Sequence, residues 1–254
     1  MPCPGSLGPM PAFPLYRPGG RFALGHSSRR LGLELLITGP ATVGAALAMP
    51  VAGAALIAVL AVTGHPAVQL DRLAAVLLEA LCPLGAALAA VSVVGRDPAV
   101  ELILTTPASY RRVLAGRAGL AVGLAAAATL ALALALFGAG IWPAGPGAAG
   151  LVLIWAPPVI WLTGIGLLVA VAGRGPALAS GAIAAIWLAE TIFAGQAKAS
   201  PLIRDQYLFA TVSHLPPGPW AANRAGLALA GTAALAVTAL LLARPARLLA
   251  VEPS

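Results

Sequence analysis

Six apolar runs, each about as long as a bilayer is thick, occupy most of this chain. Bounded by charges, Gly and Pro, they contain roughly 19–23 residues each and cover 41–63, 73–95, 118–140, 150–172, 177–195 and 222–243. At about 1.5 Å per residue, a helix of that length crosses about 30 Å of hydrocarbon. A closed barrel would need short strands of alternating polarity, and the sequence has no such pattern. We therefore predict an all-α integral membrane protein with six transmembrane helices.

The overall composition agrees with this prediction. The 254 residues are 60% hydrophobic and only 9% charged, with a mean hydropathy of +0.94, whereas soluble domains carry about 25% charged residues. Residues 1–26 are rich in Pro and lack the apolar core of a signal peptide, so we expect an irregular cytoplasmic tail there. The transmembrane domain is predicted over 27–250, followed by a short cytoplasmic tail over 251–254.

The formal net charge of +7 suggests contact with the cytoplasmic leaflet, and we expect no nucleic-acid partner, because multi-pass proteins concentrate Arg and Lys on the cytoplasmic side. With a cytoplasmic amino terminus, most of the basic residues fall inside: Arg17, Arg21, Arg29, Arg30, Arg96, Arg111, Arg112, Arg117, Arg174, Arg244 and Arg247. The outer segments contain only Arg72, Lys198, Arg204 and Arg224. Both termini are thus predicted to be cytoplasmic, in a multi-pass protein of the cell membrane.

Two further apolar segments are too short to span. Residues 27–38 place Leu on one side and the i,i+4 pair Arg30 and Glu34 on another, which predicts an amphipathic helix at the membrane interface. A plain extension of the first span is the alternative. Residues 207–215, in the long external connection before the last span, are expected to dip into or lie on the outer leaflet.

The cytoplasmic connection between spans two and three predicts a separate short helix. Asp97 is a good N-cap, and Pro98 fits the first helical position. Pro107 disfavours helix at Thr106. We expect a helix of about two turns over 98–105, parallel to the membrane, and then a new helix capped by Ser109.

This connection resembles the type-2 permease family of ATP-binding-cassette exporters. The family commonly has, between spans two and three, a Glu, aliphatic residues, a Thr-Pro pair and an Arg-bearing helix start. The matching residues here are Glu101, Leu102, Ile103, Leu104, Thr105, Thr106, Pro107, Ser109, Arg111 and Arg112. The last span is similar too, with Trp220, Asn223 and Arg224 at its start and, apart from Ala246, the family's ending from Arg244 to Leu249.

The resemblance implies that the short helix is a coupling helix, which docks on an ATPase subunit through Glu101, Ile103, Leu104, Thr105 and Pro107. It also implies a second permease copy or a related permease, a hydrophobic or amphipathic substrate moved outward, and ATP-Mg bound by the partner ATPase. The chain itself is expected to be no enzyme and to hold no cofactor, because a phosphate-binding loop needs a Lys on the nucleotide side and Lys198 is predicted to be external. Two alternatives stay open: an ordinary loop helix at 98–105, and a membrane scaffold or passive channel without an ATPase.

Two acidic residues lie inside predicted spans, Glu79 in the second and Glu190 in the fifth. An ionised carboxylate near the centre of a span costs roughly 2.5–3.5 kcal/mol, so both should face protein or water. Each can form an intramembrane ion pair, for which Arg72 and Arg224 are the candidate partners of Glu79, or line a translocation path. No spacing typical of metal ligands is present.

Pro and Gly residues inside the spans predict local features of packing. Pro50, Pro83 and the pair Pro157-Pro158 should kink spans one, two and four and leave carbonyl groups for neighbours to satisfy. Two small-xxx-small faces, Gly119 with Gly123 and Gly226 with Ala230, permit close approach of helices.

Overall fold

The computed structural model describes residues 40–95, 110–143, 147–173 and 175–243, and every regular element in these ranges is helical. In chain order the elements are α2 (Pro40–Val62), α3 (Ala67–Val76), the π-helical turn η2 (Leu77–Leu81), α4 (Cys82–Gly95), α6 (Tyr110–Gly138), the 3₁₀ turn η3 (Gly147–Ala149), α7 (Gly150–Leu153), α8 (Ala156–Ala172), α9 (Pro176–Ile192), α10 (Ala194–Ala199), α11 (Pro201–Arg204) and α12 (Pro217–Leu242). The all-helical prediction is confirmed for these residues.

Five helical segments of the described chain are long and apolar enough to cross a membrane: Thr42–Val62, Ala67–Val94, Arg112–Gly138, Gly147–Ala172 and Pro217–Leu242. They are compatible with a multi-pass membrane protein. The fifth predicted span corresponds to α9, an apolar helix of 17 residues. The count of six crossings therefore stays a prediction.

Two helices begin earlier than the apolar runs that predicted them. The third apolar run begins at residue 118, and the helix that was expected to begin after Ser109 does so: α6 begins at Tyr110 and includes Arg112 and Arg117. The last was expected from residue 222, and α12 begins at Pro217. Apolar runs mark the part of a helix that fits in hydrocarbon, and the backbone stays helical beyond that boundary. The helices predicted over 27–38 and 98–105 lie outside the described residues.

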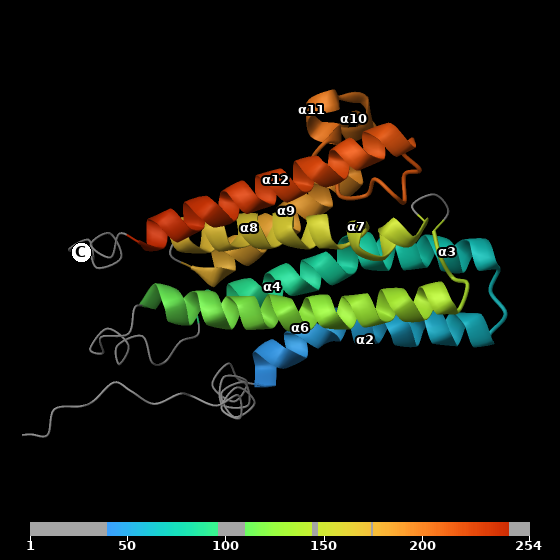
Figure 1. Cartoon of the computed structure of the whole chain (residues 1–254), viewed down its shortest axis with the longest axis horizontal. Coiled ribbons are helices and arrows are strands. Elements are labelled where there is room, and N and C mark those ends of the chain that lie inside the picture. Colours follow the sequence, from blue (N-terminus) through green and yellow to red (C-terminus); the bar gives the residue numbers. More distant parts are fainter. Residues whose placement is uncertain (1–39, 96–109, 144–146, 174, 244–254) are drawn as a thin grey trace, which may run out of the picture.

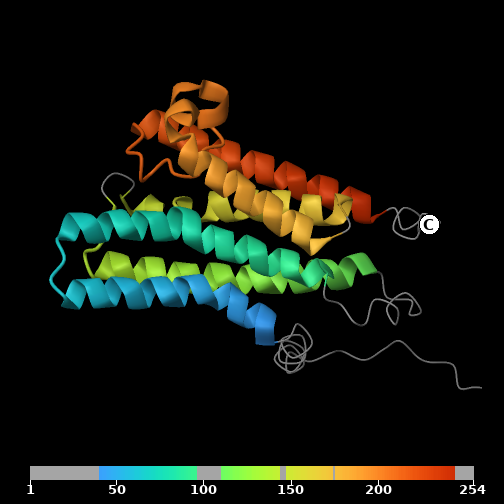
Figure 2. The same cartoon turned by 180° about the vertical axis from the view of Figure 1, so that it is seen from behind.

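The helices form a bundle with α4 and α8 at its centre (Figures 1 and 2). On one side α2 and α6 pack against α4 and against each other, and on the other side α9 and α12 pack against α8. The segment from α3 to α4 and the segment from η3 to α8 are the most deeply buried of the five long helical segments, whereas α2 and α12 are largely exposed. Exposed apolar side chains on these outer helices, such as Val59 and Leu229, suit contact with lipid.

A close crossing of α8 and α12 is made by glycines outside the two small-xxx-small motifs. A Cβ atom added to Gly231 in α12 would lie 2.6 Å from the Cα of Trp161 in α8, and one added to Gly164 in α8 would meet the carbonyl oxygen of Gly231. By contrast, a Cβ at Gly119 or Gly123 would meet nothing within 4 Å. That motif therefore marks no close helix contact within the described chain.

Candidate functional site

The candidate site is a buried polar cluster around Glu79, and a proline creates its first element. Pro83 lacks an N–H group and cannot donate the α-helical hydrogen bond to the carbonyl oxygen of Glu79. The helix widens here into the π-helical turn Leu77–Leu81, in which the Cys82 N–H donates to the Leu77 carbonyl. Such π-bulges often occur at functional sites. This turn presents the carboxylate of Glu79 to the interior of the bundle, where it is 0% exposed.

Both carboxylate oxygens of Glu79 accept hydrogen bonds from elements far away in the sequence. Oε1 accepts from the Thr211 N–H at 2.6 Å and forms an ion pair with the Arg224 guanidinium of α12. Oε2 accepts from the Val212 N–H at 3.0 Å. A buried carboxylate is tolerated when it is paired and hydrogen-bonded in this way. Of the two Arg residues considered as partners, Arg224 forms the pair, and Arg72 is exposed.

Arg224 is held by a second proline-dependent feature. The fourth long segment is interrupted between α7 and α8, and Pro158 lacks the N–H that would bond to the carbonyl of Ile154. That carbonyl instead accepts a hydrogen bond from Arg224 Nη1 at 3.3 Å. The guanidinium also lies 5.3 Å from the ring centre of Trp220, close enough for a cation–π contact. The pair Pro157-Pro158 was expected to leave a carbonyl group without its helical partner. That group is the carbonyl of Ile154, and the guanidinium of Arg224 satisfies it.

The segment from Tyr207 to Leu215 forms the third element, a single helical turn buried against the bundle. It ends in a Schellman motif, with Leu215 N–H donating to the Ala210 carbonyl at 3.1 Å and His214 N–H to the Thr211 carbonyl at 2.9 Å. His214 adopts a positive φ of 53° at the position where glycine is usual. Sequence predicted that this segment would dip into or lie on the outer leaflet. In the structure it packs against the bundle, and the following residues are all buried: Tyr207, Leu208, Phe209, Ala210 and Thr211.

Two more side chains anchor the same turn. Oε2 of Glu190, in α9, accepts a hydrogen bond from the Leu208 N–H at 2.6 Å. Asn223 Nδ2, in α12, donates to the carbonyls of Arg204 and Tyr207 at 2.6 and 2.9 Å. The two acidic residues singled out in the sequence therefore bind the same segment. The polar cluster, comprising Glu79, Glu190, Thr211, Asn223 and Arg224, joins η2, α9 and α12 to this buried turn.

The other site residues predicted from sequence, Glu101, Ile103, Leu104, Thr105 and Pro107, lie outside the described residues. Their role in ATPase coupling stays a prediction, as does a translocation role for Glu79 and Glu190. Sequence reasoning missed Thr211 and the carbonyl of Ile154. Thr211 acts through its backbone N–H and through its hydroxyl, which accepts from Trp220 and Arg224, and the use of all these groups depends on the tertiary fold. Pro158 was the one available signal for the carbonyl of Ile154.

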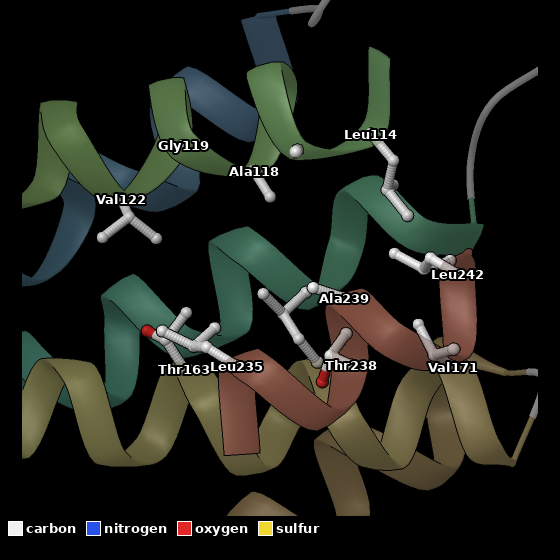
Figure 3. Close-up of a pocket in the computed structure, with 12 residues that line it drawn as sticks. Leu114, Ala118, Gly119, Val122, Thr163, Val171, Leu235, Thr238, Ala239 and Leu242 are labelled. Atoms are coloured by element: carbon white, nitrogen blue, oxygen red, sulfur yellow. The ribbon is translucent and has the colours of Figure 1, made fainter. Parts of the chain in front are cut away.

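A second feature, an apolar groove, lies in the opposite half of the bundle. It has a volume of about 270 Å³ and is lined by α6, α8 and α12. Figure 3 shows Leu114, Ala118 and Val122 of α6 across from Leu235, Ala239 and Leu242 of α12. The polar atoms of its lining side chains belong to Thr163 and Thr238, and the remaining lining residues are Gly, Ala, Val and Leu.

The described fold is thus a helical bundle of apolar helices with a polar cluster in one half and an apolar groove in the other. No family model, no curated protein and no solved structure matches the chain. Within the described ranges, no group of three or more His, Cys, Asp or Glu side chains is placed to hold a metal ion.

Proposed function

We propose that this chain is the membrane permease subunit of an ATP-binding-cassette exporter. Two such subunits, identical or related, combine with two separate ATPase chains and move a hydrophobic or amphipathic substrate outward across the cell membrane. The observation that carries the proposal is the difference between the two halves of the bundle: a polar cluster fills one half, and an apolar groove hollows the other. Such an asymmetric bundle suits a protein that opens to one side of the membrane at a time.

Helix α12 relates the two halves. Arg224, near its beginning, belongs to the polar cluster, and Leu235 to Leu242, at its end, line the groove. At 1.5 Å per residue, Arg224 and Leu235 are about 16 Å apart along the helix. In the predicted orientation the groove opens toward the cytoplasm and the cluster closes the external half.

The same geometry favours a transporter over a passive channel. A channel needs a continuous path, lined by polar groups or open to water. The external half is instead filled by buried side chains, including Tyr207, Leu208 and Phe209, and by a carboxylate with both oxygens hydrogen-bonded. Transport through this half requires that the cluster rearranges, as expected of a protein that switches between two states.

The ATPase is proposed to act through the connection between α4 and α6. These helices pack against each other, and α4 continues from the π-turn that holds Glu79. A push on the coupling helix would therefore be transmitted along α4 to the polar cluster. Ile103 and Leu104 are the proposed apolar anchors in a groove of the ATPase, with Glu101 paired to a basic residue there.

Purification of the tagged chain from its native membranes tests the proposal. We expect an ATPase subunit with a phosphate-binding loop to co-purify and to hydrolyse ATP. Truncation of an interface anchor typically costs about 2 kcal/mol or more, which is over tenfold in affinity. Leu104→Ala and Glu101→Ala should therefore each lose most of the bound ATPase.

The matched control is Val68→Ala, which alters an exposed residue at the beginning of α3, at the end of the bundle away from α6's first turn. It should retain the ATPase and its activity at the wild-type level. Absence of any ATPase, or unchanged recovery with both interface variants at normal expression, would contradict the proposal and favour a scaffold or passive channel.

A further inference from the structure

The apolar groove has the dimensions of one leaflet of a bilayer. On α6 it extends from Leu114 to Val122, and Arg112 lies two residues before Leu114 in the same helix. From Arg112 to Val122 the helix rises about 15 Å, which is half of the roughly 30 Å hydrocarbon thickness. The groove therefore begins at the charged first turns of α6, before the apolar run from residue 118, and extends into that run over about the depth of one leaflet.

The chemistry of the groove favours an apolar occupant over water. Apolar cavities stay dry, because a buried water needs two to four polar partners. Of the two hydroxyl groups in the lining, that of Thr238 donates to the Ala234 carbonyl at 2.8 Å. That of Thr163 has no partner among the described residues, and one hydroxyl alone falls short of the partners that a buried water needs. An empty groove would also forfeit the dispersion contacts of its walls. Since a dry cavity of about 150 Å³ accommodates a benzene ring, about 270 Å³ is ample for a section of hydrocarbon chain.

An exposed positive charge, Arg112, lies two residues before the groove on α6. Arg112 is exposed, and Arg112, Ala115 and Gly119 follow the i, i+3, i+7 spacing of one helix face. Ala115 and Gly119 line the groove. A guanidinium in this position suits a phosphate at the membrane surface, where it can form charge-assisted hydrogen bonds.

We infer that the groove between α6, α8 and α12 binds one anionic phospholipid, with an acyl chain between the helices and its phosphate at Arg112. The site goes beyond the proposed transport function and does not require it, since an isolated chain without an ATPase would bind the lipid equally. The lipid fills the gap that is left because α6 packs on α4 while α12 packs on α8.

The groove can be filled from either wall without disturbing the backbone. A Cβ atom at Gly119 meets nothing within 4 Å, so Gly119→Leu places a side chain into the groove. Ala239→Leu does the same from α12. The matched controls on the same two helices are Gly116→Leu, which also has open space at its Cβ, and Ala236→Leu at an exposed position. Neither control residue lines the groove.

The experiment uses the full chain in nanodiscs of phosphatidylcholine and phosphatidylglycerol with identical acyl chains, and native mass spectrometry counts the lipids that stay bound after extraction. Wild type should retain one phosphatidylglycerol. Both groove-filling variants should bind it about tenfold more weakly, the loss expected from excluding two buried methylene groups. Both controls should match wild type, and Arg112→Gln should lose the preference for phosphatidylglycerol over phosphatidylcholine.

Circular dichroism and gel filtration establish that each variant is folded. Wild-type lipid retention in both folded groove-filling variants would overturn the acyl-chain site. Equal retention of the two lipids by wild type, or an undiminished preference in Arg112→Gln, would overturn the headgroup assignment. Because Arg112 is exposed, that variant tests the inference even if a groove-filling variant does not fold.

Discussion

Glu79 in the π-turn η2 and Arg224 in α12 form a buried ion pair between residues 145 positions apart in the sequence. The carboxylate also accepts backbone N–H groups of Thr211 and Val212. The guanidinium donates to the carbonyl of Ile154. One pair therefore joins the second, fourth and fifth of the long apolar helical segments to the buried turn.

Removal of either charge should destabilise the fold strongly. Loss of one member of a buried pair typically costs about 3–5 kcal/mol, because the remaining charge stays buried without its partner. In Glu79→Gln an amide NH₂ also replaces one of the two acceptors that face the N–H groups of Thr211 and Val212. We expect Glu79→Gln and Arg224→Gln each to lower the unfolding midpoint in detergent, measured by circular dichroism during heating.

The double variant measures the coupling energy between the two charges, apart from their contacts with other groups. Glu79→Gln with Arg224→Gln should be less destabilised than the sum of the two single variants, because neither charge is then left alone. The comparison variant is Glu190→Gln, which retains an acceptor for its one hydrogen bond from Leu208 and should cost about 1 kcal/mol or less. Additive effects in the double variant would show that the ion pair contributes no coupling energy.

The crossing of α8 and α12 should be intolerant of a single methyl group. A Cβ at Gly231 would lie 2.6 Å from backbone atoms of Ile160 and Trp161, and a backbone cannot rotate away. We expect Gly231→Ala to cost roughly 1–3 kcal/mol, the usual range for overpacking, with a lower midpoint of thermal unfolding. Gly123→Ala, where the added atom meets nothing, should be neutral or stabilise α6 by up to about 1 kcal/mol. Equal midpoints for the two variants would contradict this close packing.

The positive φ of His214 makes it a site where glycine should stabilise the protein. The exposed side chain of His214 sits at the left-handed position that ends the buried turn, a conformation that costs a residue with a Cβ about 1–2 kcal/mol. His214→Gly should raise the midpoint of thermal unfolding, and His214→Val should lower it, because β-branched residues disfavour this region most. If the valine variant were as stable as the glycine variant, the turn would not have this backbone conformation.

Cysteine labelling tests the predicted orientation. In a background with Cys3→Ser and Cys82→Ala, single cysteines are introduced at Val68, in the first turn of α3, and at Ser109, in the connection before α6. The distribution of Arg and Lys predicts that an impermeant maleimide labels Val68→Cys on intact cells and labels Ser109→Cys only after the membrane is opened. Labelling of Ser109→Cys on intact cells would reverse the topology.

Much of the helical fold could be predicted from local sequence, and the exceptions have identifiable causes. Apolar runs located α2, α4, α8, α9 and α12, since a backbone in hydrocarbon must satisfy its hydrogen bonds within a helix. The helix expected after Ser109 does begin at Tyr110. The start of α12 was predicted too late, because Pro217 and Pro219 fit the first turn of a helix and an apolar run does not mark that turn. The motif Gly119-Gly123 indicated a close contact that the described chain does not make, because small residues permit an approach and do not require one.

By itself, the sequence determined the helical class, the apolar segments and the need to shield Glu79 and Glu190 from lipid, since each of these follows from the local cost of burying polar groups. Only the tertiary structure decided that Arg224 and not Arg72 pairs with Glu79. It also decided that Thr211 and Val212 offer their N–H groups to that carboxylate and that Gly164 and Gly231 meet at a crossing. These choices depend on helix rotation and on distances between segments far apart in the chain, and such quantities are set by the packing of the whole bundle.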